Sequence, residues 1–268
     1  MKSSENYINV NKDSWNKKVE VNYNSKFYDV KTFLKTKNSL NKIELELLGD
    51  VSQKKILHLQ CHFAMDSISL ANLGAEVTAV DFSEEAIKKA IYLCQQTSST
   101  VKFICCDIYN LPDFLNEKFD IVFTSYGTIG WLPDLEKWAG IVKQFLKPKG
   151  KFVFVEFHPV VWMFDNDFNE VFYSYFNTEE IVEALTGTYA DKQSKIITET
   201  ISWNHPLTDV ITNLLNKGME INSFKEYDYS PYNCLNGMEE FEKGKFRIKK
   251  FGNKIPLVYS IVCVCATE

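Results

Sequence analysis

The sequence predicts an α/β protein in which helices cover both faces of a mostly parallel β-sheet. Between residues 54 and 158, five short apolar segments alternate with segments of helical length and pattern. The apolar segments carry hydrophobic residues at successive positions, which is typical of strands that are buried on both faces. The chain of 268 residues, 45% of them hydrophobic, is long enough to bury a large core without disulfides or a structural metal.

The local patterns predict the elements in order. A helix is expected within residues 39–50, where leucines and an isoleucine form an apolar stripe and Ser39 is a suitable N-cap residue. Strands are then expected at residues 54–60, 76–81, 101–107, 119–126 and 151–158. The helices between them are expected at 66–74, at 83–96 with Ser83 as the N-cap, and at 132–150 with Pro148 and Gly150 at its end.

The pattern changes after residue 158. Residues 160–204 are rich in aromatic side chains and contain two segments that predict antiparallel strands, 170–176 and 195–203. A helix at 205–218, a strand at 219–229 and a closing strand at 256–267 follow. We therefore expect an N-terminal helical extension or lid at 1–50, followed by one domain at 51–268 with an insertion at about 160–204.

Composition and charge exclude several classes of function. The formal net charge is −5 and Arg247 is the only arginine, which argues against a nucleic-acid partner. No apolar run approaches the ~18 residues of a membrane-spanning helix. The polar N-terminus lacks a signal sequence, and seven cysteines without a C-x-x-C pair predict neither a disulfide framework nor a zinc ribbon. These features predict a cytoplasmic protein.

The strongest functional signal is the loop at residues 60–64 together with Asp81. In open α/β sheets, ligands bind outside the carboxyl ends of the strands, and an acid about 20 residues beyond the first loop can hold ribose hydroxyls. Gln60 and Asp81 are 21 residues apart. The spacing predicts a nucleoside site. A pyrophosphate cofactor such as NAD is disfavoured, because Gln60, His62 and Ala64 stand where a dinucleotide fingerprint has glycine.

The segment ILHLQCHFAMDSISLANLGAEVTAVDFSEEAIKKA resembles the first motif and second strand of the class I S-adenosylmethionine-dependent methyltransferases. It is a variant in which HLQCHF replaces the glycine-rich sequence. The resemblance continues through CCDIYNLP and FDIVFTSYGTIGWLPDLEKWAGIVKQFLKPKGKFVFVEFHP. It implies a Rossmann-like sheet of seven strands with an antiparallel last strand, the hairpin of 219–229 and 256–267 at one edge, and S-adenosyl-L-methionine as the cofactor.

The resemblance also implies which residues line the methionine part of that cofactor. Gln60, Cys61 and His62 would contact it from the loop after the first strand, and Ser125 with Tyr126 would close the same side from the fourth strand.

The nucleoside part of the cofactor would contact a second group of residues. Asp81 would accept the ribose hydroxyls, with Phe82 against the adenine and Ser83 nearby. Asp107 would meet the adenine amino group, and Ile108 would cover a face of the ring.

Catalysis depends mainly on the alignment of the reacting atoms, and a general base is needed only if the acceptor carries a proton. Tyr126, Glu156, His158 and His205 are expected at the carboxyl edge of the sheet, and we expect one of the two histidines to serve as the base.

A different reading of the histidines is a metal site. His58, Cys61 and His62 could suggest one, but side chains at neighbouring strand and loop positions point apart, so no metal is expected. His58 is instead expected to be a hydrogen-bonded core residue. The sequence thus predicts a methyltransferase for a small-molecule acceptor. The alternative is a non-catalytic Rossmann-like protein that binds the same cofactor or a related nucleoside.

Overall fold

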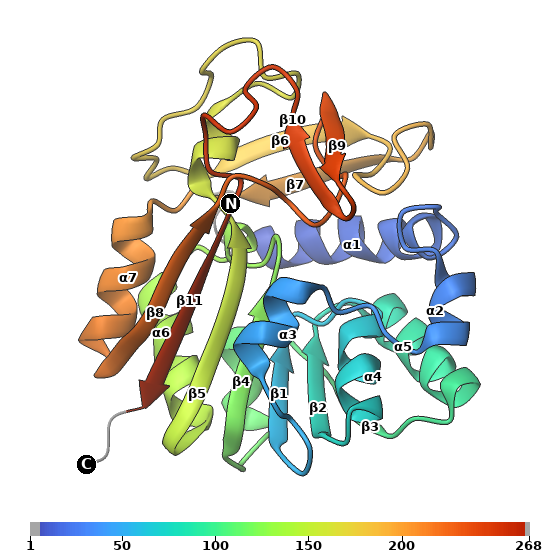
Figure 1. Cartoon of the computed structure of the whole chain (residues 1–268), viewed down its shortest axis with the longest axis vertical. Helices are drawn as coiled ribbons and strands as arrows, with labels where there is room; N and C mark the ends of the chain where they lie inside the picture. Colours follow the sequence, from blue (N-terminus) through green and yellow to red (C-terminus); the bar gives the residue numbers. More distant parts are fainter. Residues whose placement is uncertain (1–5, 266–268) are drawn as a thin grey trace.

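A computed structural model describes residues 6–265 and contains a seven-stranded sheet with the strand order β3-β2-β1-β4-β5-β11-β8 (Figure 1). Its strands are β1 (Lys55–Leu59), β2 (Glu76–Asp81), β3 (Val101–Cys105), β4 (Phe119–Ser125), β5 (Leu146–Phe157), β8 (Met219–Tyr227) and β11 (Val258–Cys265). The first five run parallel, and β11 is antiparallel to both β5 and β8. The expected Rossmann-like fold is confirmed, including the edge hairpin. Residues 266 and 267 of the predicted closing strand lie outside the described residues.

Helices cover both faces of this sheet, because the strands carry apolar side chains on both sides. The helices and short 3-10 turns are α1 (Tyr7–Tyr23), α2 (Val30–Thr36), α3 (Lys42–Leu48), α4 (Met65–Asn72), α5 (Glu84–Thr97), η2 (Ile108–Asp113), η3 (Ile129–Trp131), α6 (Leu135–Phe145), η4 (Pro159–Met163) and α7 (Leu207–Asn216). In β1, Leu57 and Leu59 pack in the core beneath α6 and α7, whereas Ile56 packs on the opposite side beneath α3 and α4.

The junction of α6 and β5 differs from the expectation. Residues 146–150 are not the end of a helix, because α6 stops at Phe145 and β5 already begins at Leu146. Gly150 packs so closely against the carbonyl of Phe119 that a Cβ would lie 3.0 Å from it, and the pairing of β4 with β5 shifts register there. Pro148 and Gly150 therefore mark a bulge inside the strand.

The segment after η4 forms a small separate sheet, part of which was predicted wrongly. It consists of β6 (Ile181–Thr186) and β7 (Ile197–Ser202), paired antiparallel. Residues 170–176 are not a strand, because Val171 makes only an isolated bridge and Asp165 binds the backbone N–H of Glu170 in a turn. A further hairpin, β9 (Met238–Glu242) and β10 (Lys245–Ile248), was not predicted.

The N-terminal helix α1 lies across the carboxyl ends of the strands, beneath β6 and β7 (Figure 1). The side chain of Asn11 links it to β7: its amide donates to the Ile201 carbonyl at 2.7 Å and accepts from the Ile201 N–H at 2.9 Å. Ser39 does not cap α3, contrary to the expectation, because α3 starts at Lys42 and the Ser39 hydroxyl donates to Asp66 instead.

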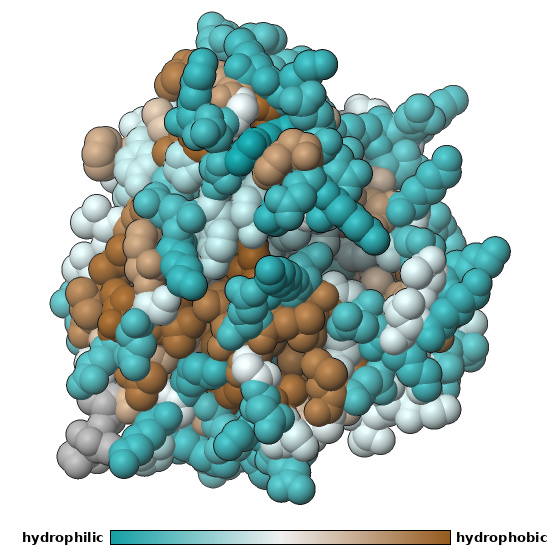
Figure 2. All heavy atoms as spheres, viewed as in Figure 1, coloured by the Kyte–Doolittle hydropathy of each residue, from teal (hydrophilic) through white to brown (hydrophobic). Residues whose placement is uncertain are grey.

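The surface carries a mixed pattern (Figure 2). On the face shown, hydrophobic residues gather over β5, β8 and β11, whereas hydrophilic residues dominate around β9 and β10. None of the helices between residues 6 and 265 combines the length and the apolar character that crossing a membrane requires.

Candidate functional site

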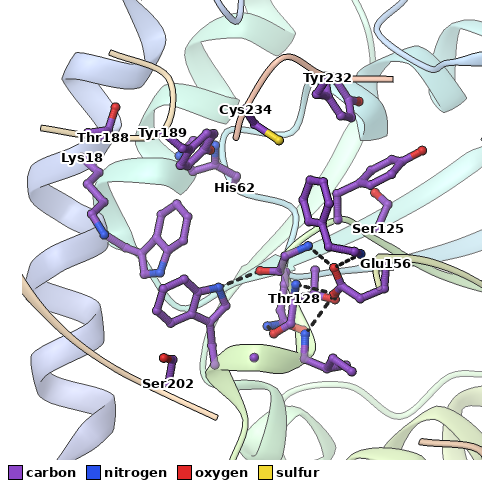
Figure 3. A pocket seen from close by; sticks show the side chains of 18 of the residues that line it. Lys18, His62, Ser125, Thr128, Glu156, Thr188, Tyr189, Ser202, Tyr232 and Cys234 are labelled. Atoms are coloured by element: carbon purple, nitrogen blue, oxygen red, sulfur yellow. Dashed lines mark hydrogen bonds between the residues drawn. The ribbon is translucent and has the colours of Figure 1, made fainter. Parts of the chain in front are cut away.

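A cavity of about 850 Å³ lies between the carboxyl edge of the sheet and the elements above it. Its floor comes from the loops that follow β1, β2, β3 and β4. Its roof comes from α1, the loop at 24–29 and the segment around β6 and β7. Figure 3 shows side chains from both walls facing the same space.

The loop after β1 shapes the floor through an unusual backbone. Gln60, His62 and Ala64 have φ angles of 54°, 51° and 63°, in the left-handed region that glycine adopts most easily. These are the three positions at which the motif variant lacks glycine. The backbone path of a glycine-rich loop is thus retained with side chains in place.

Asp81 holds this loop from the end of β2. Its carboxylate accepts the backbone N–H of His62 at 2.7 Å and the backbone N–H of Ser83 at 2.9 Å. The side chain is 8% exposed and lines the cavity. Burial raises the pKa of Asp81 to about 6, although the backbone hydrogen bonds favour the ionised form. At neutral pH the cavity floor therefore carries a buried negative charge.

His58 is a core residue, as expected. Its Nδ1 lies 2.7 Å from the Ser67 hydroxyl, and its ring packs against Phe123 with the centroids 4.9 Å apart. Burial lowers its pKa to about 3, so the imidazole is neutral at physiological pH.

In the loop after β1, Gln60 and His62 each have one buried polar atom without a hydrogen-bond partner among residues 6–265. Gln60 donates its amide N–H to the Thr128 carbonyl at 2.9 Å, but its Oε1 accepts no hydrogen bond. The Nδ1 of His62 lies 3.2 Å from the Tyr28 hydroxyl, whereas its Nε2 is unpartnered. Buried polar groups are normally hydrogen-bonded, so these two atoms indicate a ligand that supplies the missing partners.

Most of the residues predicted to contact the nucleoside part of the cofactor lie at the cavity. Phe82, Asp107 and Ile108 line the cavity, and burial raises the pKa of Asp107. Ser83 does not line it. Its hydroxyl accepts the Ala86 N–H as the N-cap of α5 and donates to Asn16 of α1 at 2.6 Å, so it acts as a cap and a link to the lid.

Glu156 fixes the loop after β4 rather than offering itself to a ligand. Its two carboxylate oxygens accept the backbone N–H groups of Gly127, Thr128, Ile129 and Phe157 and the hydroxyl of Thr128 (Figure 3). The side chain is 3% exposed. With every accepting direction used by the protein, Glu156 is a positioning residue and not a base.

Ser125 and Tyr126 line the cavity at the end of β4, as expected, and the surroundings of Tyr126 are acidic. Its ring packs edge-on against Tyr232, with the centroids 5.0 Å apart. Burial, followed by the charge of the nearby Glu44, raises the pKa of Tyr126 well above its ordinary value. The hydroxyl is therefore protonated at physiological pH and cannot be a base there. Burial likewise raises the pKa of Asp66, which lines the same wall.

The two candidate histidines lie in different places. His158 does not line the cavity: its Nε2 lies 2.9 Å from Glu226, and its Nδ1 accepts the Val160 N–H at 3.2 Å. Both ring nitrogens are engaged, which leaves none for an acceptor. His205 lines the cavity, with its Nε2 2.8 Å from the Leu132 carbonyl. Because a carbonyl only accepts, Nε2 carries the proton and Nδ1 is the basic nitrogen.

Aromatic residues to which the sequence analysis assigned no role also line the cavity. The rings of Trp15 and Trp131 meet edge to face at 5.5 Å, and Trp131 donates its indole N–H to the Gly127 carbonyl at 2.6 Å. Tyr189, from the loop after β6, hydrogen-bonds to the Tyr28 hydroxyl and lies near Trp15. Of these residues, Tyr189 lies in the aromatic-rich segment 160–204. Within the described part of the chain, no three His, Cys, Asp or Glu side chains are grouped as metal ligands.

The comparison with protein families identifies the kind of domain to which the cavity floor belongs. A family model described as a methyltransferase domain matches residues 56–150, from β1 into β5. Residues 56–150 belong to the methyltransferase domain family. The resemblance inferred from the motifs is therefore confirmed. The matched segment contains the loops after β1, β2, β3 and β4, whereas α1 and the segment around β6 and β7 lie outside it.

Curated relatives match over the same region. A ubiquinone biosynthesis O-methyltransferase of Idiomarina loihiensis is 27% identical over 134 residues, which are 48% of this chain and 55% of that protein. The ubiquinone/menaquinone biosynthesis C-methyltransferase UbiE of Rickettsia felis is 34% identical over 115 residues, 41% of this chain and 44% of the relative. The match spans about half the length of each relative.

Solved structures share the fold of almost the whole chain. An S-adenosylmethionine-dependent methyltransferase from Clostridium acetobutylicum covers 90% of this chain and 98% of its own, with a TM-score of 0.60 and 18% identity. A structure titled "DhpI-SAH complex" covers 98% and 99%, with a TM-score of 0.57 and 15% identity. The fold that this chain shares with solved structures thus extends beyond residues 56–150.

Proposed function

We propose that this protein is an S-adenosylmethionine-dependent methyltransferase that acts on a small-molecule acceptor. The observation that carries the proposal is the cavity floor: a left-handed loop after β1, tied to the buried Asp81 carboxylate, at the carboxyl edge of a parallel sheet. The methyltransferase domain family and the structural neighbours support it.

The residues of the floor fit the cofactor. The unpartnered Gln60 Oε1 and His62 Nε2 can bond to its polar groups, and the Asp81 carboxylate can accept from the ribose hydroxyls. Asp107 and Ile108 would hold the adenine. Asp66 also lines the cavity and offers a carboxylate to the positively charged end of the cofactor.

The cofactor, when bound, supplies a methyl group on a sulfonium and leaves as the neutral thioether S-adenosylhomocysteine. The chain itself positions the acceptor and keeps water out. The loop held by Glu156 carries Trp131, and α1 brings Trp15 over the same space. Alignment of this kind can lower a barrier by ~7–11 kcal/mol. We infer that the N-terminal segment and the insertion together form the acceptor pocket.

His205 is the base that we propose for an acceptor that carries a proton. It lines the cavity, and its Nδ1 can take up the proton that leaves the acceptor as the new bond to the methyl group forms. Burial lowers the pKa of His205, so the imidazole is neutral and able to accept at physiological pH.

Mass spectrometry of the purified protein tests the proposal without knowledge of the acceptor. We expect S-adenosylmethionine or S-adenosylhomocysteine to co-purify, and calorimetry to show saturable binding of both. A folded protein that binds neither compound would refute the proposal. Binding without release of S-adenosylhomocysteine over a broad panel of acceptors would instead identify a non-catalytic binding protein.

A further inference from the structure

A buried ammonium group faces the cavity from its roof. Lys18, on α1, is 6% exposed and lines the cavity. Its Nζ lies 5.3 Å from the centroid of the Trp15 ring and 5.8 Å from that of Trp131. In Figure 3 its side chain extends from α1, near Thr188. The other lysine in the cavity wall, Lys192, is exposed and hydrogen-bonds to Asn236.

Lys18 has no acidic partner in the part of the chain that the structure describes. Its Nζ makes no ion pair or hydrogen bond there, and burial alone shifts its pKa, downward to about 8. A pKa of about 8 leaves the group protonated at physiological pH. An ammonium withdrawn from water without a counter-ion is unfavourable, and aromatic faces replace only part of its hydration. An anionic group on a ligand would therefore supply the counter-ion that Lys18 does not find among the described residues.

The distribution of charge in the cavity restricts where an anionic ligand can bind. Asp66, Asp81 and Asp107 line the floor, where they would repel a negative group. Asp29, Asp165 and Glu183 also line the cavity, as does the exposed Lys192, so Lys18 is the one buried cation among the lining residues. The neighbouring wall is aromatic and includes Trp15 and Trp131. A ligand that satisfies both features has a flat apolar body and one anionic oxygen group.

We propose that Lys18 anchors a carboxylate on an aromatic methyl acceptor. This substrate class rests on the methyltransferase function proposed above. A single lysine without an arginine beside it suits a monoanion better than a phosphate, which arginine and clustered cations recognise. The carboxylate is the anchor and not the attacking atom, so Lys18 is a binding residue that orients the acceptor.

Matched ligand pairs test the anchor directly. Benzoate and 2-naphthoate are titrated against benzamide and 2-naphthamide, which have the same shape without the charge, and tryptophan fluorescence reports binding. The full chain is used with saturating S-adenosylhomocysteine and again without it. The variants are Lys18→Met and Lys18→Gln. The control is Lys17→Met, because Lys17 is exposed on the same helix and pairs with Asp13.

The wild-type protein and Lys17→Met should bind each carboxylate at least about tenfold more tightly than its amide, the ratio expected for one charge-assisted hydrogen bond. Both Lys18 variants should bind acid and amide equally, within about twofold, and retain their affinity for S-adenosylhomocysteine. Three results would overturn the proposal: equal binding of acid and amide by the wild type, no binding of either carboxylate up to about 10 mM, or a preference that survives in both Lys18 variants. A wild-type protein that does not bind S-adenosylhomocysteine would refute the proposed methyltransferase function. The two failures can be distinguished, because the acid–amide comparison is also made without S-adenosylhomocysteine.

Discussion

The floor and the roof of the cavity are built in opposite ways. The floor is polar and held by its own backbone: Asp81 and Glu156 bind the N–H groups of the loops that they position. The roof is aromatic, and its one buried cation, Lys18, has no such partner within residues 6–265. A floor whose shape is fixed before ligand binding suits a constant cofactor, whereas an aromatic roof with one unpaired charge suits selection of an acceptor.

The largest predicted effect concerns the base, where floor and roof meet. His205→Gln should lower turnover of a protonated acceptor by ~10²–10⁴-fold, because positioned proton transfer is lost. The rate profile against pH should lose its ascending limb. His158→Gln is the control, since His158 does not line the cavity, and should change turnover by less than about threefold. Turnover losses below threefold in both variants would refute the proposal of a histidine base.

Glu156→Ala tests whether the floor depends on buried carboxylates. Five donors would lose their acceptor, so the free energy of unfolding should fall by ~3–5 kcal/mol. Urea titration measures this, with the exposed Glu220→Ala on β8 as the control. A loss as small as that of the control would show that the loop after β4 is held by other contacts.

Lys18→Met tests the roof. It should raise the free energy of unfolding at neutral pH, whereas Glu156→Ala should lower it. The pKa of Lys18 is about 8 in the folded protein, below the 10.5 of an exposed lysine, so the unfolded state binds more protons between these values. Wild-type stability should therefore rise with pH from 8 to 10.5. At pH 7 the variant should be more stable by roughly 2–3 kcal/mol, and this gain should shrink toward pH 10.

Thermal unfolding at pH 7 and pH 10 measures this difference. A variant that is less stable than the wild type at pH 7 would mean that Lys18 has a partner that stabilises its charge.

The smallest effect is expected at the backbone of the floor. Ala64→Gly relieves a left-handed φ of 63°, which costs a non-glycine residue ~1–2 kcal/mol, and loses a methyl group worth ~0.8 kcal/mol. The free energy of unfolding should stay unchanged or rise by up to ~1 kcal/mol. Ala71→Gly, inside α4, should lower it by ~0.5–1 kcal/mol. Equal decreases in the free energy of unfolding for Ala64→Gly and Ala71→Gly would show that the loop is not strained at Ala64.

The sequence was informative where the determinants are local. The spacing from Gln60 to Asp81 and the alternation of strands and helices predicted the floor and the sheet, because each depends on residues close together in the chain. The bulge at Gly150 was wrongly predicted as a helix end, because proline and glycine are also typical of the residues that follow a helix. The register shift that marks the bulge involves β4, a separate segment of the chain.

The roof could not be predicted because its contacts join distant segments. Asn11 meets Ile201 across 190 residues, and Trp15 meets Trp131 from another element. The hydrophobic periodicity of the sequence reports local structure and does not indicate such pairs. His158 was predicted at the site because it follows the fifth strand, and Ser83 because the family resemblance implies it. The side chain of each bonds to protein groups outside the cavity instead.

Calorimetric titration with S-adenosylhomocysteine at pH 8 tests the central claim most directly. Asp81→Ala should weaken binding by roughly 2–3 kcal/mol, because a pair of charge-assisted hydrogen bonds to the ribose is lost. Glu76→Ala, at the exposed start of the same strand, should bind like the wild type. Wild-type affinity should also fall below pH 6, where Asp81, with a pKa of about 6, becomes protonated. Unchanged affinity in a folded Asp81→Ala variant would contradict the account, because the cofactor would then bind elsewhere.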